Sequence, residues 1–223
     1  APASTWAITV TVRPDAASNA ASVASSTTNE SWVTRVTSPP PAAPVPDPEV
    51  LTEVVPAAVV VLEDAPVDPD EQALQREGYV LALTSKEFLQ ALHQGAHGKI
   101  AITYFEWAGQ SDQKILMPWR MIDGPESADA VAAEIARAPI RRASRTSMSG
   151  GLRFAKPLFD DSGYRGLRRV IDVSGDGANN AGPLVELIRD DVLAAGITIN
   201  GLPIMLKRPY KGTMDMDNLD EYY

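Results

Sequence analysis

The stretch RRVIDVSGDGANNAG, residues 168–182, decides the fold. Its first seven residues carry an apolar, β-branched centre, which is typical of a buried strand. The glycine-rich corner Gly175–Gly177 ends that strand and places Asp176 just beyond its carboxyl end. Because ligands of open α/β sheets bind outside the carboxyl ends of strands, the sequence marks Asp176 as a candidate functional residue.

Strands and helices alternate around this stretch. The sequence predicts strands at 57–63, 99–108, 114–122, 168–174 and 197–204. It predicts helices at 68–94, where Thr84 and Ser85 are a candidate start of a second helix, and at 127–138, 147–160 and 183–196. This order is typical of an α/β fold with a doubly wound, mainly parallel sheet flanked by helices. The strand at 114–122 follows its predecessor across a short turn, so we expect one antiparallel edge strand, and Pro118 favours the edge position.

Single polar residues are expected to fix local structure. Ser127 is the expected N-cap of the helix at 127–138, since its hydroxyl can accept from free backbone amides. Asp172 lies within a strand, so its carboxylate needs a partner if it is buried. Arg168 and Arg169 are the candidate partners in the sequence.

The chain divides into three parts by composition. Residues 1–56 form a Pro-, Ala- and Ser-rich arm, which includes SPPPAAPVPDPEV at 38–50, and proline at this density favours an extended tether. Residues 57–206 form the α/β domain, and residues 207–223 form an acidic tail that we expect to be solvated. Trp6 and Trp32 are unusual in a linker and are candidate anchors for a partner.

Charge and composition exclude several classes of function. The chain of 223 residues has a net charge of −9, so nucleic acid is not an expected partner. Without cysteine it has neither disulfides nor thiol chemistry. No apolar run reaches the roughly 18 residues of a membrane span. The chain begins APAST, as a processed chain would, which favours an extracytoplasmic location, either periplasmic or secreted.

Several motifs together resemble a known family. DEQALQREGYVLAL, ITYFEWAG, RTSMSGGL and RRVIDVSGDGANN are similar, in this order, to exported bacterial proteins of the von Willebrand factor A-like (VWA) superfamily. The resemblance covers about 67–223. It implies a VWA/Rossmann-like fold with a metal-ion-dependent adhesion site, where three loops bind a divalent cation such as Mg²⁺ and a partner's carboxylate completes the coordination.

The resemblance implies metal ligands at three positions of this chain. Thr146 matches the second loop and Asp176 the third. In the first loop, Leu62, Asp64 and Pro66 stand where the family has Asp, Ser and Ser, so the remaining candidate is Asp64, or Glu63 if the register shifts by one residue. The other interpretation is structural: Thr146 caps the following helix, and Asp176 orders its own loop with Asn179 and Asn180.

Three functions follow from these observations. The first is a non-enzymatic protein-interaction module with an impaired metal site, which binds a protein or complex through Asn179, Asn180, Trp6 and Trp32. The second is a working Mg²⁺-dependent adhesion domain. The third is a structural subunit whose arm attaches it to a larger assembly, such as a membrane complex. No phosphate-binding loop or nucleophile elbow is present, and nothing in the sequence brings Glu106 and Asp123 together.

Overall fold

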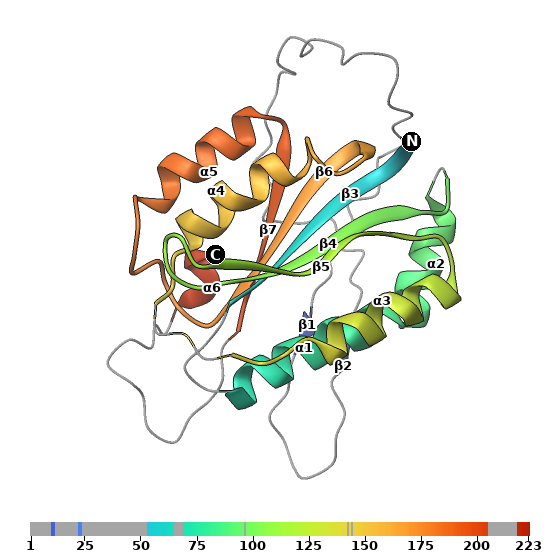
Figure 1. Cartoon of the computed structure of the whole chain (residues 1–223), viewed down its shortest axis with the longest axis horizontal. Helices are drawn as coiled ribbons and strands as arrows, with labels where there is room; N and C mark the ends of the chain where they lie inside the picture. The colour runs from blue at the N-terminus through green and yellow to red at the C-terminus, as the bar shows by residue number, and fades with distance from the viewer. Residues whose placement is uncertain are drawn as a thin grey trace.

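A computed structural model of the whole chain describes residues 10–11, 22–23, 53–64, 69–95, 97–141, 143, 145–204 and 218–223 (Figure 1). Its strands are β1 (Val10–Thr11), β2 (Ser22–Val23), β3 (Glu53–Asp64), β4 (Ile100–Trp107), β5 (Gln113–Ile122), β6 (Tyr164–Gly175) and β7 (Ile197–Pro203). Its helices are α1 (Pro69–Leu83), α2 (Lys86–Gln94), α3 (Pro125–Arg137), α4 (Met148–Leu158), α5 (Val185–Ala194) and α6 (Leu219–Tyr222).

Five strands form the main sheet, in the order β5-β4-β3-β6-β7. β3 pairs in parallel with both β4 and β6, and β6 pairs in parallel with β7. β5 pairs antiparallel with β4 at the outer edge, with a register irregularity beside Pro118. The predicted doubly wound, mainly parallel sheet with one antiparallel edge strand is confirmed.

The central strand β3 begins earlier than the sequence predicted. It starts at Glu53, so four residues of the predicted arm belong to the sheet. Val54 and Val55 extend the β-branched run, and Pro56 is tolerated because only β6 lies beside it. The pairing with β4 begins at Ala58, so at Pro56 one side of the strand needs no ladder hydrogen bond.

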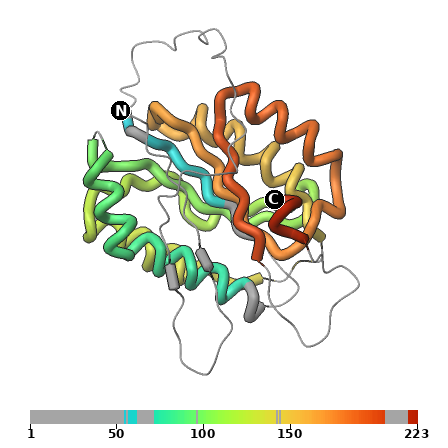
Figure 2. The backbone as a smooth tube through the Cα atoms, turned by 180° about the vertical axis from the view of Figure 1, so that it is seen from behind, coloured from blue at the N-terminus to red at the C-terminus, as the bar shows by residue number. Residues whose placement is uncertain are grey.

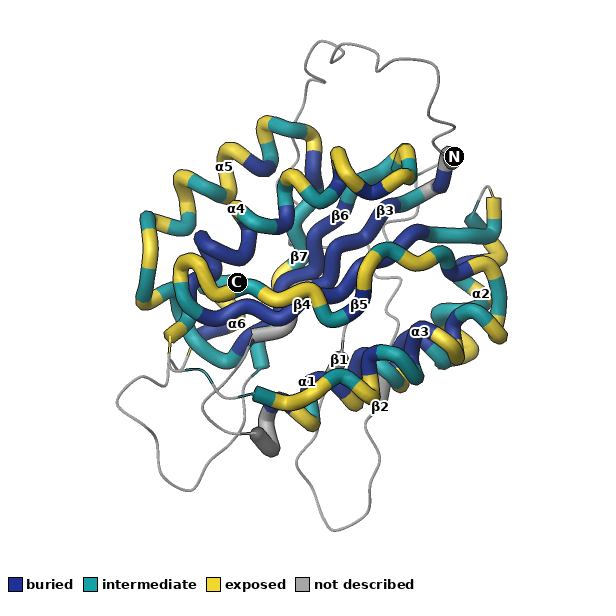
Figure 3. The backbone as a smooth tube through the Cα atoms, viewed as in Figure 1, coloured by how far each residue is buried: buried dark blue, intermediate teal, exposed yellow. Residues whose placement is uncertain are grey.

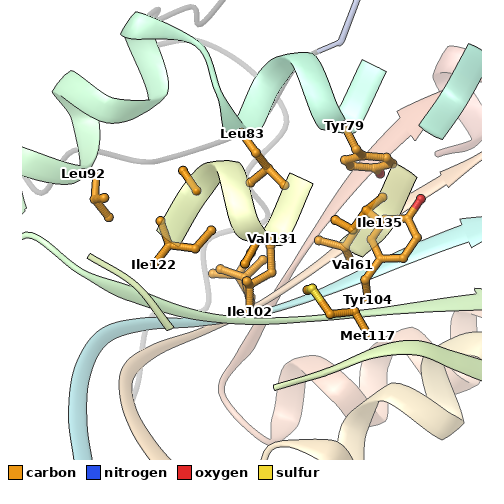
Figure 4. Packing of buried hydrophobic residues seen from close by; sticks show 13 residues of the cluster. Val61, Tyr79, Leu83, Leu92, Ile102, Tyr104, Met117, Ile122, Val131 and Ile135 are labelled. Atoms are coloured by element: carbon orange, nitrogen blue, oxygen red, sulfur yellow. The ribbon is translucent and has the colours of Figure 1, made fainter. Parts of the chain in front are cut away.

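Helices cover both faces of the sheet (Figures 1 and 2). α4 and α5 pack on one face, around a core that includes Phe105, Trp107, Leu152 and Ile171. α1, α2 and α3 pack on the other, around a core that includes Val61, Tyr79, Ile102, Tyr104 and Val131 (Figure 4). Strand β4 is almost entirely buried between the two layers, as expected for a strand covered on both faces, whereas the outer strands β5 and β7 are partly exposed (Figure 3).

Two predicted helix caps are wrong. α3 is capped at Gly124, and Ser127 is instead its third residue, whose hydroxyl accepts from the backbone amides of Asp123 and Gly124. α4 is capped by Ser147, one residue after Thr146, and the Ser147 hydroxyl accepts from the Gly150 amide at 3.2 Å. The Thr146 hydroxyl is therefore not the cap of α4, and this matters for the site.

The four parallel strands β3, β4, β6 and β7 all end on the same side of the sheet. We call this side, where their carboxyl ends lie, the carboxyl edge; it is distinct from the outer strands β5 and β7. From β3 the chain passes to β4 on one side, and later returns to β6 on the other side. The order of strands therefore reverses at β3, and open α/β sheets bind ligands at such a switch point.

Candidate functional site

The second and third loops meet at the carboxyl edge. The second loop joins α3 to α4 and carries Thr146, and the third loop joins β6 to α5 and carries Asp176. Asn180 joins them with two hydrogen bonds: its amide N–H donates to the Thr146 carbonyl at 2.8 Å, and its side-chain oxygen accepts from the Thr146 N–H at 3.0 Å. A Cβ built on Gly177 would lie 3.7 Å from the Thr146 hydroxyl, so this side chain faces the residue after Asp176.

Asn179 joins the third loop to the start of α4. Its side-chain oxygen accepts from the backbone amide of Ser149 at 3.1 Å and lies 3.2 Å from the Ser149 hydroxyl. Its side-chain nitrogen donates to the Pro183 carbonyl at 3.2 Å. These contacts match the loop-ordering interpretation of Asn179 and Asn180, and partner binding by either residue stays a prediction. We call Thr146, Ser149, Asn179 and Asn180 the amide cluster.

Close packing at two glycines holds the loops together. A Cβ on Gly182 would lie 2.8 Å from the Ser147 hydroxyl. Gly182 also has φ +86°, a backbone conformation that residues with a side chain rarely adopt. A Cβ on Gly150 would lie 2.8 Å from the Gln110 carbonyl oxygen. The Ser147 amide also donates to the Ala108 carbonyl at 2.6 Å, so the start of α4 is joined to the end of β4.

The C-terminal segment, residues 218–223, also lies at this edge. Leu219 is 1% exposed, and Tyr222 and Tyr223 are partly buried, so the prediction of a solvated tail is wrong for these three residues, whereas Asn218, Asp220 and Glu221 are exposed. The Tyr222 hydroxyl accepts from the Asn179 amide at 3.1 Å, and the Tyr223 hydroxyl donates to the Gly177 carbonyl at 3.1 Å. The missed signal is the spacing of Leu219, Tyr222 and Tyr223, which places three large side chains on one side of a helical turn.

A second polar cluster lies at the same edge, on the α1 face of the sheet. The Glu106 side chain is 0% exposed, and its carboxylate accepts from the Arg141 Nε at 2.7 Å and from the Gln72 amide. Arg141 also donates to Asp112 at 2.8 Å, and its backbone amide donates to Gln72 at 3.2 Å. We call Gln72, Glu106, Asp112 and Arg141 the acid–arginine cluster.

Sequence reasoning missed this cluster. The signal was present in α1, where Gln72, Gln75 and Arg76 stand at the helical spacing of the buried residue Tyr79. Gln75 donates to the Ser174 hydroxyl, and Arg76 donates to the Ala138 carbonyl. α1 therefore presents a buried polar stripe to the carboxyl edge.

Glu106 and Asp123 do not converge. Glu106 lies near the carboxyl end of β4, whereas Asp123 follows the antiparallel strand β5 and therefore lies at the opposite edge. There the Asp123 carboxylate accepts from Ser127 at 2.7 Å.

Among the described residues, Arg141 and Asp172 have shifted pKa values. Burial lowers the pKa of Arg141, but hydrogen bonds to Glu106 and Asp112 and their negative charges outweigh this effect, so its pKa is raised. Burial raises the pKa of Asp172 from 3.8 to about 6, although a hydrogen bond from Asn200 at 2.6 Å opposes the shift. The prediction that Arg169 is the partner of Asp172 is wrong, because Arg169 donates to the Ala195 carbonyl instead.

The remaining predicted site residues can be placed only in part. Asp64 ends β3 and pairs in register with Trp107 of β4, which puts its backbone at the carboxyl edge. Its side chain, Pro66, Trp6 and Trp32 lie outside the described residues. Within the described residues, no three His, Asp, Glu or Cys side chains form a group that could hold a metal ion. Coordination of a divalent cation by Thr146, Asp176 and Asp64 stays a prediction.

The mixed five-stranded sheet, flanked by helices and with its loops gathered at one edge, is a VWA-like fold. The profile of the family described as "Protein of unknown function (DUF1194)" matches residues 58–223. The chain therefore belongs to the DUF1194 family. A search of the curated proteins gives no match.

Two solved structures of proximal thread matrix protein 1 from the mussel byssus have a similar fold. One, in crystal form 2, is 17% identical with a TM-score of 0.51. The other, described as having a zinc-occupied MIDAS (metal-ion-dependent adhesion site) motif, is 19% identical with a TM-score of 0.53. Each match covers 67% of this chain and 38% of the mussel protein. At this identity the likeness shows the fold alone. Over the described residues, no helix is long and apolar enough to cross a membrane.

Proposed function

We propose that this chain is a non-enzymatic, VWA-like protein-interaction module that binds its partner at the carboxyl edge without a resident metal ion. The observation that carries this proposal is the contact between the second and third loops. Asn180 and Asn179 hold these loops to each other and to α4 with hydrogen bonds from the protein itself. The edge is therefore organised by amide and hydroxyl groups, in the place where a metal ion would otherwise join the loops.

The composition of the first loop supports an impaired metal site. Leu62 and Pro66 carry no side-chain oxygen, so Thr146, Asp176 and Asp64 are the side chains left to coordinate a cation. Mg²⁺ requires near-octahedral oxygen coordination and commonly keeps several waters. Three ligands on three loops would hold it weakly compared with the five positions of the full motif.

The chemistry of the described residues supports a binding role rather than catalysis. Glu106 is buried and already accepts from Arg141 and Gln72, so it is poorly placed as a general base. The hydroxyl of Ser147 donates to the Ala181 carbonyl at 2.8 Å, which uses its proton. α2, whose last turn carries His93, lies far from the carboxyl edge (Figure 1).

An exposed apolar patch beside the third loop offers a contact surface. Leu184 and Leu187 are 69% and 63% exposed at the start of α5, directly after the loop. Exposed large apolar side chains beside a polar loop are typical of an interaction site. We further propose that the module works outside the cytoplasm as an accessory subunit, with the proline-rich arm as its attachment to a larger assembly.

A metal-dependent adhesion domain is the second candidate. The mussel protein of similar fold has a zinc-occupied MIDAS motif, and here Thr146 and Asp176 stand on loops that meet. In this version a divalent cation would be held by Thr146, Asp176 and Asp64, and it would supply a vertex for a partner carboxylate.

Site-specific photo-crosslinking tests the proposed binding edge. A photo-reactive amino acid would replace Leu184 in the full chain, in the organism that makes it. Leu167 is the matched control, because it is a leucine of similar exposure, 63%, near the start of β6 at the opposite edge. We expect a discrete adduct with another protein from position 184 and none from 167. Adducts from 167 alone would contradict the proposal.

A further inference from the structure

The C-terminal segment makes specific contacts with the third loop. α6 lies at the carboxyl edge in both views of the fold (Figures 1 and 2). Tyr222 and Tyr223 are partly buried and pack against the core on the α4 and α5 face. Their two rings also contact each other edge to face, with centroids 6.1 Å apart. This places both hydroxyl groups beside the loop that carries Asp176.

The two hydroxyl groups bind backbone on either side of Ala178. The Asn179 amide donates to Tyr222 at 3.1 Å, and Tyr223 donates to the Gly177 carbonyl at 3.1 Å. Gly177 directly follows Asp176, and Asn179 directly precedes Asn180. The two tyrosines therefore hold the backbone between Asp176, the candidate metal ligand, and Asn180, which forms hydrogen bonds with the second loop.

A glycine in β7 provides independent support for this docking. A Cβ on Gly201 would lie 2.7 Å from the Tyr223 carbonyl oxygen and 2.8 Å from the Tyr223 Cβ. Gly201 does not have a positive φ, so the backbone conformation alone does not require glycine. The close approach of Tyr223 does require it, because any side chain at 201 would displace the C-terminal residue.

We infer that Tyr222 and Tyr223 are positioning residues, which couple the docking of the C-terminal segment to the geometry of the third loop. When the segment is docked, Gly177 and Asn179 are held, and Asn179 in turn reaches Ser149 on α4. When the segment is released, the loop loses two of its backbone anchors. A partner that binds the loop and a partner that binds the C-terminal segment would then influence each other through this coupling. The effect on partner binding rests on the proposed function, whereas the coupling itself does not.

Amide hydrogen exchange on the full chain tests the coupling without any partner. Tyr222→Phe and Tyr223→Phe, alone and together, remove the hydroxyl groups and keep the rings. Tyr164→Phe is the matched control, because this partly buried tyrosine lies at the opposite edge. Since each lost hydrogen bond corresponds to roughly a fivefold change in a local opening equilibrium, we expect exchange in 176–183 to rise about fivefold in each single variant and further in the double variant.

Exchange in β3 and β4 separates a positioning role from a general structural one. We expect it to stay unchanged in the tyrosine variants, with the thermal midpoint of unfolding close to that of the wild type. Gly201→Ala, which displaces Tyr223 with both hydroxyls present, should loosen 176–183 in the same way. Unchanged exchange of 176–183 in the double variant, or an equal rise throughout the chain, would overturn the inference. A failure of crosslinking at Leu184 would leave this result unaffected, so the two proposals fail separately.

Discussion

The acid–arginine cluster and the amide cluster lie at the same edge of the sheet but use different chemistry. On the α1 face, a fully buried carboxylate is neutralised by an arginine whose side chain is 30% exposed. On the α4 face, neutral amides and hydroxyls join the second and third loops. Both clusters hold loops at the switch point, yet only the first places a full charge inside the protein.

This difference predicts that the acid–arginine cluster contributes mainly to stability and that the amide cluster is the part that can adapt to a partner. A buried charge is costly when its partner is lost, so the acid–arginine cluster should control folding. Ser149 is buried, but Asn180 is exposed and Thr146 is partly exposed, so water can replace the hydrogen bonds between these two residues at small cost. This part of the amide cluster should therefore tolerate rearrangement when a partner binds.

Arg141→Ala should give the largest loss of stability. It leaves the buried Glu106 carboxylate without its cation, and breaking a buried pair costs about 3 kcal/mol or more. The measurement is the free energy of unfolding by urea at pH 7. The matched control is Arg120→Ala, because Arg120 pairs with Glu134 at 3.0 Å on the surface and should contribute under about 1 kcal/mol. Equal losses in the two variants would contradict the role given to burial.

Asp172→Asn should stabilise the protein at neutral pH. Asp172 is a buried carboxylate whose hydrogen-bond partner is an amide rather than an arginine, and its pKa is raised from 3.8 to about 6. A raised acid pKa gives stability that is fully present below pH 3.8 and is lost as pH rises through about 6. The wild-type free energy of unfolding should therefore fall across this window, by about 2–3 kcal/mol.

The asparagine variant cannot ionise and should lack this component of the pH dependence. Chemical denaturation at several pH values between 4 and 7 measures the difference between the two chains, which should grow in favour of Asp172→Asn as pH rises. A constant difference across this range would show that Asp172 does not titrate as the structure implies.

Ser147→Ala should have an intermediate effect on stability. The Ser147 hydroxyl caps α4 and also donates to the Ala181 carbonyl, so one substitution removes contacts to the helix and to the third loop. Loss of such a cap costs about 1–2 kcal/mol. Thermal unfolding, followed by circular dichroism, gives the value. A variant as stable as the wild type would show that the α4 terminus does not depend on this cap.

Asn180→Ala should have the smallest effect on stability. Asn180 is exposed, so water can replace its side-chain oxygen as the acceptor for the Thr146 amide, at a cost below about 1 kcal/mol. Asn180→Asp keeps an oxygen acceptor and should be closer to the wild type. Denaturant titration of both variants measures this order. A loss from Asn180→Ala as large as that from Arg141→Ala would remove the contrast between the two clusters.

Most of the fold could be predicted because its signals are local. A run of β-branched residues indicates a buried strand, the alternation of strands with helices indicates the α/β class, and Pro118 indicates an edge strand. Each of these signals depends on a few neighbouring residues. The start of β3 could not be predicted in this way, since Pro56 is compatible with the strand only where β4 is absent beside it. That condition depends on the lengths of the neighbouring strands rather than on the sequence around Pro56.

The candidate site could be predicted from the sequence at four loop residues, Thr146, Asp176, Asn179 and Asn180, but not in the contacts that join them. The resemblance indicated Thr146 and Asp176, and the structure brings their loops together. The bonds from Asn180 to Thr146 could not be foreseen, because they join residues 34 positions apart and use only the backbone groups of Thr146, which its side chain does not reveal. Glu106 and Arg141 were both visible in the sequence, but their pairing depends on how the second loop crosses the end of β4.

A calorimetric titration of the full chain with Mg²⁺, Mn²⁺ and Zn²⁺, with Asp176→Ala titrated in parallel, tests whether the carboxyl edge holds a metal ion. If the carboxyl edge is organised by protein hydrogen bonds without a resident metal ion, neither chain should show saturable binding. Saturable binding to the wild-type chain that is lost in Asp176→Ala would contradict the claim, and it would establish the metal-dependent adhesion domain in its place.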